Sequence, residues 1–198
     1  MAAKRRAEMM EETRAKLVQA ARAAFAAKGY SRASMDELTA EVGLTRGALY
    51  HNFRDKIGLL QAVIDQIDAE MVVRLRAARE QASDGWTGLL AEYTAYIDMA
   101  LEPEIQRIVL LDGPAVLGAP SQWPSQNACL QATTQTIQAL IDQEVVKPVD
   151  AEAAARLLNG AALSAALWIA AADDPRGVLA EASEAFRHLA AGLLRGER

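Results

Sequence analysis

The sequence predicts an all-α fold, in which a small N-terminal helical domain is joined by one long helix to a larger helical domain. Apolar residues make up 52% of the 198 residues, and many are alanine. Alanine favours helices, whereas the β-branched and aromatic residues that favour strands are sparse. Apolar positions also recur at helical spacing, and glycine, proline and capping residues divide that pattern into segments of helical length.

The first two predicted helices lie within the first 42 residues. In TRAKLVQAARAAFAAK, residues 13–28, Leu17 and Phe25 share one apolar face, and Gly29 ends the helix. The second helix begins after Ser34, and Glu37 follows three residues later. This spacing predicts a capping box, in which the serine hydroxyl accepts from a free backbone N–H and the glutamate reaches back.

A glycine turn precedes the third predicted helix. Gly43 and Leu44 form the turn, and Thr45 can cap the helix that follows. Leu49 and Phe53 lie four residues apart and are expected to face inward. Two short helices joined by such a turn predict a helix-turn-helix. The opposite face carries no acidic residue, and its members suit phosphates and base edges: Arg46, Gly47, Tyr50 and His51.

This region resembles the tetracycline-repressor (TetR) family of bacterial transcription regulators. The likeness covers roughly residues 12–64 and rests on AFAAKGY, then SMDELTAEVGLTRGALYHNF, then DKIGLLQAV, in that order and at that spacing. Two positions depart from the family pattern. Asn52 stands where the family usually has histidine or tyrosine, and Ile57 stands where an acid is frequent. We expect Asn52 to donate to a phosphate instead.

The resemblance implies a DNA-binding role for eight residues. Those matching Arg46 and Gly47 contact base edges, and the residue matching Lys56 contacts a phosphate. The full set is Ser34, Thr45, Arg46, Gly47, Tyr50, His51, Asn52 and Lys56. Structural alternatives stay open: Ser34 and Thr45 can act only as caps, Tyr50 can be partly core, and Arg46 can be a solvated charge. A catalytic role for His51 is not favoured, because no acid or nucleophile lies at a useful spacing.

Charge separates the two predicted domains. Residues 1–56, an N-terminal arm with the helix-turn-helix, hold 11 Lys/Arg and 7 Asp/Glu, a net charge of +4. Residues 57–198, the predicted ligand-binding and dimerisation domain, hold 10 and 19, a net charge of −9. A basic end on an acidic protein is consistent with contact between that end and a polyanion.

The remaining helices are predicted from periodicity and breaks. Residues 55–81 form one long helix of roughly 40 Å. Further helices are expected over 86–101, over 104–112 until Asp112-Gly113-Pro114 interrupts it, and over 125–146. Asp150 caps a helix that runs to about residue 172, and Asp174-Pro175 starts the last one, which runs to about residue 194.

A small-molecule pocket is expected between helices of the larger domain, where ligands bind in helical bundles. Its candidate lining residues, each of which can equally be core, are Tyr93, Tyr96, Met99, Leu111, Asp112, Trp123 and Trp168. Asp112 can recognise a cationic or hydroxylated ligand. It can also cap the Gly113-Pro114 break, an interpretation we favour slightly.

The last two helices are candidates for a dimer interface. Residues 151–171 contain ten alanines, and the resemblance implies that the last two helices of each subunit form a four-helix interface. The candidate interface residues form one stripe on each helix. They are Ala154, Leu158, Ala161, Ala165 and Trp168 on the first, and Val178, Ala182, Ala185, Phe186 and Leu189 on the second. The alternative is ordinary monomer core.

Other classes of protein are not favoured. One cysteine excludes an internal disulfide, and two histidines without CxxC or HExxH make a metal site or cofactor unexpected. The N-terminus lacks the apolar segment of a signal peptide. The apolar run 157–172 is short for a membrane span, so we expect a cytoplasmic protein. The sequence predicts a homodimeric repressor that binds a palindromic DNA operator and is released by a small-molecule effector. The alternative is a helical binding protein or enzyme that does not bind DNA.

Overall fold

The computed structural model describes residues 2–196, without the side chains of residues 2–4 and 6. This part of the chain is helical and contains no strand beyond one bridge between Val146 and Leu194. The all-α prediction is therefore confirmed. The α-helices are α1 (Ala2–Lys28), α2 (Met35–Glu41), α3 (Arg46–Phe53), α4 (Lys56–Glu80), α5 (Gly85–Asp98), α6 (Gly113–Leu117), α7 (Pro124–Asp142), α8 (Ala151–Ala171) and α9 (Pro175–Ala191).

Three shorter helical segments complete the order of elements. Two are 3₁₀ turns, η1 (Met99–Leu101) and η3 (Pro120–Gln122), and the third is a π-helix, η2 (Ile105–Asp112). We expected Asp112-Gly113-Pro114 to interrupt the helix here. Instead the chain continues directly from η2 into α6, because Pro114 occupies the first turn of α6, where its missing N–H removes no helical hydrogen bond.

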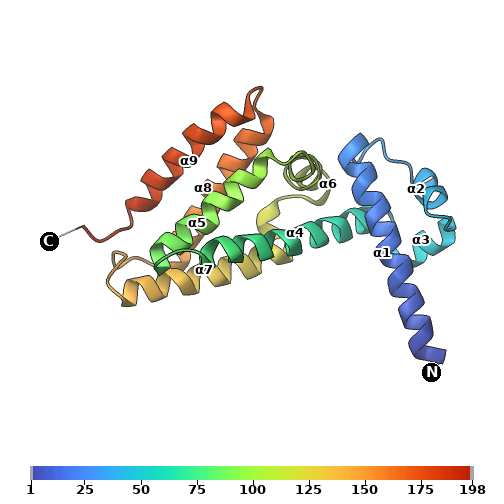
Figure 1. Ribbon diagram of the computed structural model, residues 1–198, viewed down its shortest axis with the longest axis horizontal. Coiled ribbons are helices and arrows are strands. Elements are labelled where there is room, and N and C mark those ends of the chain that lie inside the picture. The colour runs from blue at the N-terminus through green and yellow to red at the C-terminus, as the bar shows by residue number, and fades with distance from the viewer. Residues whose placement is uncertain (1, 197–198) are drawn as a thin grey trace. The chain divides into compact units, whose positions relative to one another are not determined.

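The chain packs as two compact units (Figure 1). The first contains the chain up to Ile67 together with Arg107–Gly118, and the second contains Asp68–Gln106 and Ala119–Arg198. These packing units differ from the predicted domains, which meet between residues 56 and 57. The α4 helix contributes residues to both units.

The first unit is held together by apolar side chains from its four main helices. In Figure 1, α1 is the long blue helix, and α2 and α3 both pack against it. Leu17, Phe25, Leu49 and Leu60 are completely buried. Full burial of each side chain stabilises the unit by roughly 1.5–3 kcal/mol. The α1 helix begins well before the predicted residue 13, and Gly29 ends it in the left-handed conformation, with φ of 79°.

The second unit is a helical bundle centred on α8. This helix packs against α5, α7 and α9, and α8 and α9 run antiparallel (Figure 1). The buried alanines Ala155, Ala162 and Ala166 lie on the packed side of α8. Asp150 caps α8 by accepting from Ala153 N at 2.7 Å, as the sequence predicts.

Candidate nucleic-acid interface

The turn before α3 forms for the reasons that the sequence suggests. Gly43 has φ of 65°, a conformation that costs glycine little. Thr45 caps α3, because its hydroxyl oxygen accepts from Ala48 N at 3.2 Å. Leu49 and Phe53 are buried, so the inner face of α3 is held against the first unit.

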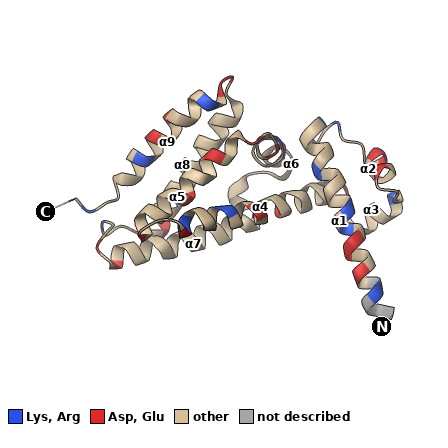
Figure 2. Cartoon of the chain, in the orientation of Figure 1, with Lys and Arg blue, Asp and Glu red and all other residues tan. Residues whose placement is uncertain are grey.

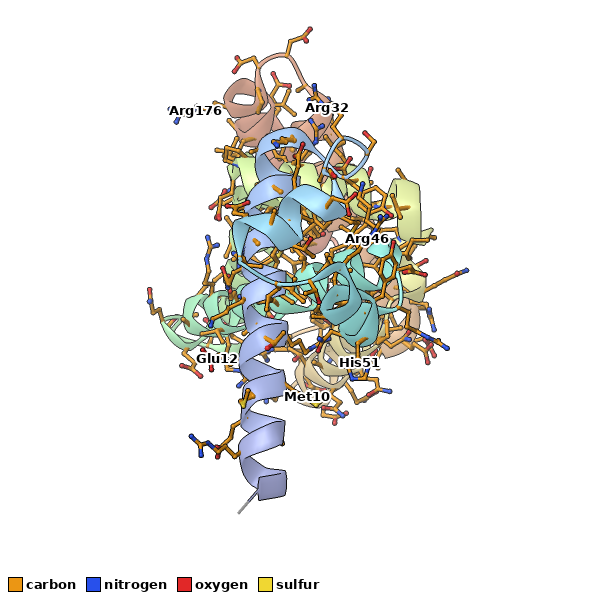
Figure 3. The ribbon with its side chains drawn as sticks, turned by 90° about the vertical axis from the view of Figure 1, so that its right-hand side faces the viewer. Met10, Glu12, Arg32, Arg46, His51 and Arg176 are labelled. Carbon is orange, nitrogen blue, oxygen red and sulfur yellow. The ribbon has the colours of Figure 1, made fainter. Side chains whose placement is uncertain are left out.

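The outer face of α3 is exposed to solvent. Arg46, Gly47, Tyr50 and His51 are all exposed, and Figure 3 shows Arg46 and His51 on this helix. The Arg46 guanidinium lies 5.8 Å from the centre of the Tyr50 ring. A hydrogen bond to Tyr50 and the charge of Asp36 raise the pKa of Arg46, which therefore remains a cation.

An acid on α2 approaches this face, a contact that the sequence did not reveal. Asp36 pairs with Arg46 Nε at 3.2 Å, with both side chains largely exposed. A second α2 acid, Glu37, pairs with Lys28 at 2.9 Å. Figure 2 shows the acidic colour of α2 beside α3. Exposed pairs of this kind are weak because water screens them, so a phosphate or base can replace Asp36 at low cost.

Gly47 leaves open space on the same face. A Cβ added there meets only the Thr45 hydroxyl oxygen, at 3.7 Å, within the described residues. Neither packing nor helical geometry therefore requires a glycine. Glycine inside a helix is about 0.5–1 kcal/mol less stable than alanine, so Gly47 costs the helix stability that no contact within the described residues explains.

The other predicted contact residues have partners within the first unit. The Ser34 hydroxyl accepts from Glu37 N at 3.5 Å, but Glu37 binds Lys28, so the structure shows only the first half of the predicted capping box. Asn52 donates to Ala48 O at 2.7 Å.

Lys56 is the first residue of α4, and its side chain contacts the turn between α1 and α2. Its Nζ is 4.4 Å from the centre of the Tyr30 ring and 3.5 Å from Ser31 O. Burial lowers the pKa of Lys56. The contact with Ser31 O uses one of the three ammonium donors, so the others remain for a phosphate.

Two family models match the chain. One, described as bacterial regulatory proteins of the tetR family, covers residues 17–63. The other, described as a tetracyclin repressor-like C-terminal domain, covers residues 86–193. The chain belongs to the TetR family.

Individual TetR-family proteins extend this match along the chain. The crystal structure of a TetR-family transcriptional regulator from Pectobacterium atrosepticum is 50% identical, with a TM-score of 0.88 over 96% of this chain and 98% of that one. The Tn10 TetC protein of Escherichia coli is 28% identical over 77% of this chain and 78% of its own. The transcriptional repressor Rv1474c of Mycobacterium tuberculosis is 31% identical over 61% of this chain and 62% of its own.

These likenesses decide between the functions that the sequence left open. This TetR-family chain is a ligand-responsive, DNA-binding transcriptional regulator and not an enzyme. Among the described residues, no cluster of three or more His, Cys, Asp or Glu side chains could hold a metal ion.

The predicted pocket residues of this TetR-family regulator are divided between the two units. Tyr93, Met99 and Trp123 are buried in the second unit, Tyr96 is partly buried there, and Trp168 is exposed. The Tyr93 hydroxyl donates to Asn159 Oδ1 at 2.6 Å. Burial raises the pKa of Tyr93, so the hydroxyl stays protonated.

Leu111 and Asp112 belong to the first unit, not to the bundle. Leu111 is exposed. The favoured capping role of Asp112 is wrong, because its side chain makes no capping bond to α6. Instead it accepts from Tyr30 N at 2.7 Å and pairs with Arg107 at 3.4 Å. Contacts between residues about 80 apart in sequence cannot be found from local spacing.

The predicted dimer stripes fall on two different faces of α8 and α9. Four members are buried within the protomer, as the alternative interpretation of monomer core predicts: Ala154, Leu158, Ala182 and Phe186. Ala161, Ala165 and Val178 are partly exposed, and Ala185, Trp168 and Leu189 are exposed. Leu157, which is 76% exposed, lies outside the predicted stripes.

Within the described residues, α8 is the one helix with the length and apolar composition of a membrane span. This evidence is weak, because the core helix of a soluble protein passes the same test. Since α8 packs against three other helices, we interpret it as a bundle helix with one apolar face left uncovered.

Proposed function

We propose that the protein is a cytoplasmic, homodimeric repressor that binds a palindromic operator through α3 and releases it when a small molecule binds. The observation that carries this proposal is the exposed face of α3. It presents a guanidinium, a phenol and an imidazole around a glycine that the fold does not require. Two relatives are named transcriptional repressors and one is named an activator, which favours this direction of regulation.

Within this interface we assign base contacts to Arg46 and Gly47. A guanidinium can donate two bonds to guanine O6 and N7, and Gly47 lets the α3 backbone approach the groove. Thr45, Tyr50 and His51 contact phosphates or bases. Ser34 adds a contact at the N-terminus of α2. Asn52 and Lys56 are the weakest members of the set, because the structure gives their donors partners inside the protein: Ala48 O and Ser31 O.

The DNA assignment is tested by fluorescence anisotropy with labelled DNA from upstream of the protein's own coding region. Arg46→Ala should cost roughly 1–3 kcal/mol of discrimination between operator and unrelated DNA. Arg176→Ala is the matched control, because it removes the same charge from an exposed position on α9 in the second unit. Operator affinity that is equal in the two variants would refute the role of the α3 face.

A second copy of the chain is the partner that we propose for the exposed face of α8 and α9. Leu157, Trp168 and Leu189 are 76%, 51% and 67% exposed. Large apolar side chains exposed on two helices that pack together are candidates for an interaction surface. Closed two-fold dimers are the commonest oligomers, and a two-fold dimer requires half-sites roughly 34–36 Å apart or a multiple of that distance.

Sedimentation tests the dimer. Leu157→Arg should produce folded monomers at micromolar concentration, because Leu157 lies outside the protomer's own core. Val73→Arg places the same charge on α4 at a side chain that is 68% exposed, and it should leave the dimer intact. A dimer that persists in Leu157→Arg would exclude this face.

For DNA to be released, the effector must bind more tightly to a state in which the two α3 helices of the dimer no longer match the spacing of the DNA grooves. The α4 helix begins next to α3 in sequence and continues into the second unit, so a shift of its far end can move the DNA-binding helices. A coupling of about 1–3 kcal/mol weakens DNA binding 5- to 150-fold. Operator DNA must then weaken effector binding by the same factor, and equal effector affinity with and without DNA would refute the coupling.

A further inference from the structure

A groove in the second unit lies between η3, α7 and α8. It has a volume of about 210 Å³, and its lining includes Ser121, Gln126 and Asn127 from one side and Arg156, Asn159 and Gly160 from α8. Leu130 and Leu163 supply an apolar part of its wall. None of its lining residues was predicted as a ligand contact.

We propose that this groove binds a small organic carboxylate. Its lining contains three carboxamides, a hydroxyl and a guanidinium, and no acidic side chain. These groups can donate several hydrogen bonds to an anion, and the guanidinium has the planar geometry that matches a carboxylate. The volume is below the roughly 300–1,000 Å³ of pockets for drug-sized ligands, so the molecule should be a single ring or a short chain.

Arg156 retains donors for such a ligand. Its Nε and Nη2 donate to one oxygen of Glu152, at 3.0 and 2.6 Å, within a pair whose side chains are both more than half exposed. Because these bonds use one edge of the guanidinium, Nη1 can donate into the groove. An exposed pair of this kind is weak, so a ligand carboxylate can compete with Glu152.

Asn159 is held in place by the core. Its Oδ1 accepts from the buried Tyr93 hydroxyl at 2.6 Å, and the Tyr93 ring packs on Phe186 at a centroid distance of 4.9 Å. With the amide oxygen engaged, the amide NH₂ of Asn159 is the group left to face a ligand. The amide therefore offers a donor whose orientation is fixed before binding, which reduces the entropic cost of binding.

Gly160 keeps the groove open. A Cβ at this position meets no described atom within 4 Å, so the protomer's own packing does not require glycine in the middle of α8. Glycine there is about 0.5–1 kcal/mol less stable than alanine. The open space at Gly160 is part of the volume that a ligand can occupy.

The site is tested by calorimetry on the full chain without DNA, using benzoate and pentanoate as probes and benzamide as the neutral counterpart of benzoate. We expect benzoate to bind at least tenfold more tightly than benzamide. Arg156→Gln should remove that preference. Gly160→Leu should abolish binding while the chain stays folded, because its side chain meets no described atom of the protomer.

Ser164→Leu is the matched control, since it adds the same side chain to an exposed α8 position outside the groove lining. It should leave benzoate binding unchanged. If neither carboxylate binds, or if benzamide binds equally well, the ligand class is wrong. If Gly160→Leu still binds benzoate, the carboxylate does not bind in this groove. If Ser164→Leu loses binding as Gly160→Leu does, the loss does not depend on the groove lining and the groove assignment fails.

The idea that a ligand in this groove releases DNA rests on the proposed function, whereas binding of a carboxylate to the groove does not. Carboxylate binding that leaves operator affinity unchanged supports the groove and refutes only its role in releasing DNA. Carboxylate binding that weakens operator affinity, and does so in wild type but not in Gly160→Leu, supports both.

Discussion

Replacing Gly47 by alanine should make the protein more stable and a weaker DNA binder. The structure explains the first effect, because an added Cβ lies 3.7 Å from the Thr45 hydroxyl oxygen, an ordinary van der Waals distance. Alanine restricts the unfolded chain and suits the helix, which contributes about 0.5–1 kcal/mol. For a protein of this size, that gain raises the melting temperature by roughly 1–4 °C.

The second effect follows from the position of the new methyl group. Gly47 stands beside Arg46 on the exposed face of α3, so the methyl group separates the helix backbone from the base edges. A displaced helix lengthens the Arg46 contacts, and the loss of one such contact costs roughly 1–3 kcal/mol, or 5- to 150-fold in operator affinity. Binding to unrelated DNA, which depends on phosphates, should change little.

Two measurements check this pair of effects: thermal unfolding without DNA and anisotropy titration with operator DNA. Gly43→Ala is the contrasting variant. Its Cβ meets no described atom within 4 Å, but φ of 65° makes any side chain strained there, so stability should fall. A loss of stability in Gly47→Ala, or operator binding equal to wild type, would refute the reasoning.

Three further substitutions test the packing. Gly58→Ala should destabilise the first unit by roughly 1–3 kcal/mol, because its Cβ would lie 2.2 Å from Phe53 O; a denaturation midpoint equal to wild type would contradict this. Tyr93→Phe leaves Asn159 Oδ1 without its donor and should cost about 1 kcal/mol in urea unfolding; no change would mean that water replaces the hydroxyl. Asp112→Ala removes a bond between a carboxylate and a backbone N–H and should cost roughly 1.5–3 kcal/mol, whereas unchanged amide exchange at the α1–α2 turn would show that the bond does not hold it.

The DNA-binding end of the protein is largely determined by local sequence. Capping, helix termination and the inward spacing of Leu49 and Phe53 depend on residues within a few positions of each other, and the structure shows each of them. The exposure of Arg46 and Tyr50 then follows, because they occupy the other side of a short helix whose inner side is known.

Contacts across the fold changed the roles of several residues in the same unit. Lys56 contacts Ser31 O, 25 residues away, whereas the bond from Asn52 to Ala48 O is local, because the two residues lie one turn apart on α3. The sequence favours a helix cap for Asp112, but its carboxylate accepts from Tyr30 N and makes no cap. A side chain donates or accepts wherever the fold brings a partner, and residue type alone does not name that partner.

The sequence by itself determined the helical class, most helix limits, the recognition helix and the family. Only the tertiary structure decided which face of α8 turns inward, that the α7–α8 groove exists, and that Gly160 borders open space. The physical reason is the composition of α8, in which alanine and leucine occupy both sides of the helix. Periodicity identifies the residues that share a face. When two faces are similarly apolar, packing against α5, α7 and α9 selects the face that is buried. Leu158 is therefore buried in the protomer, and Leu157 is exposed on its surface.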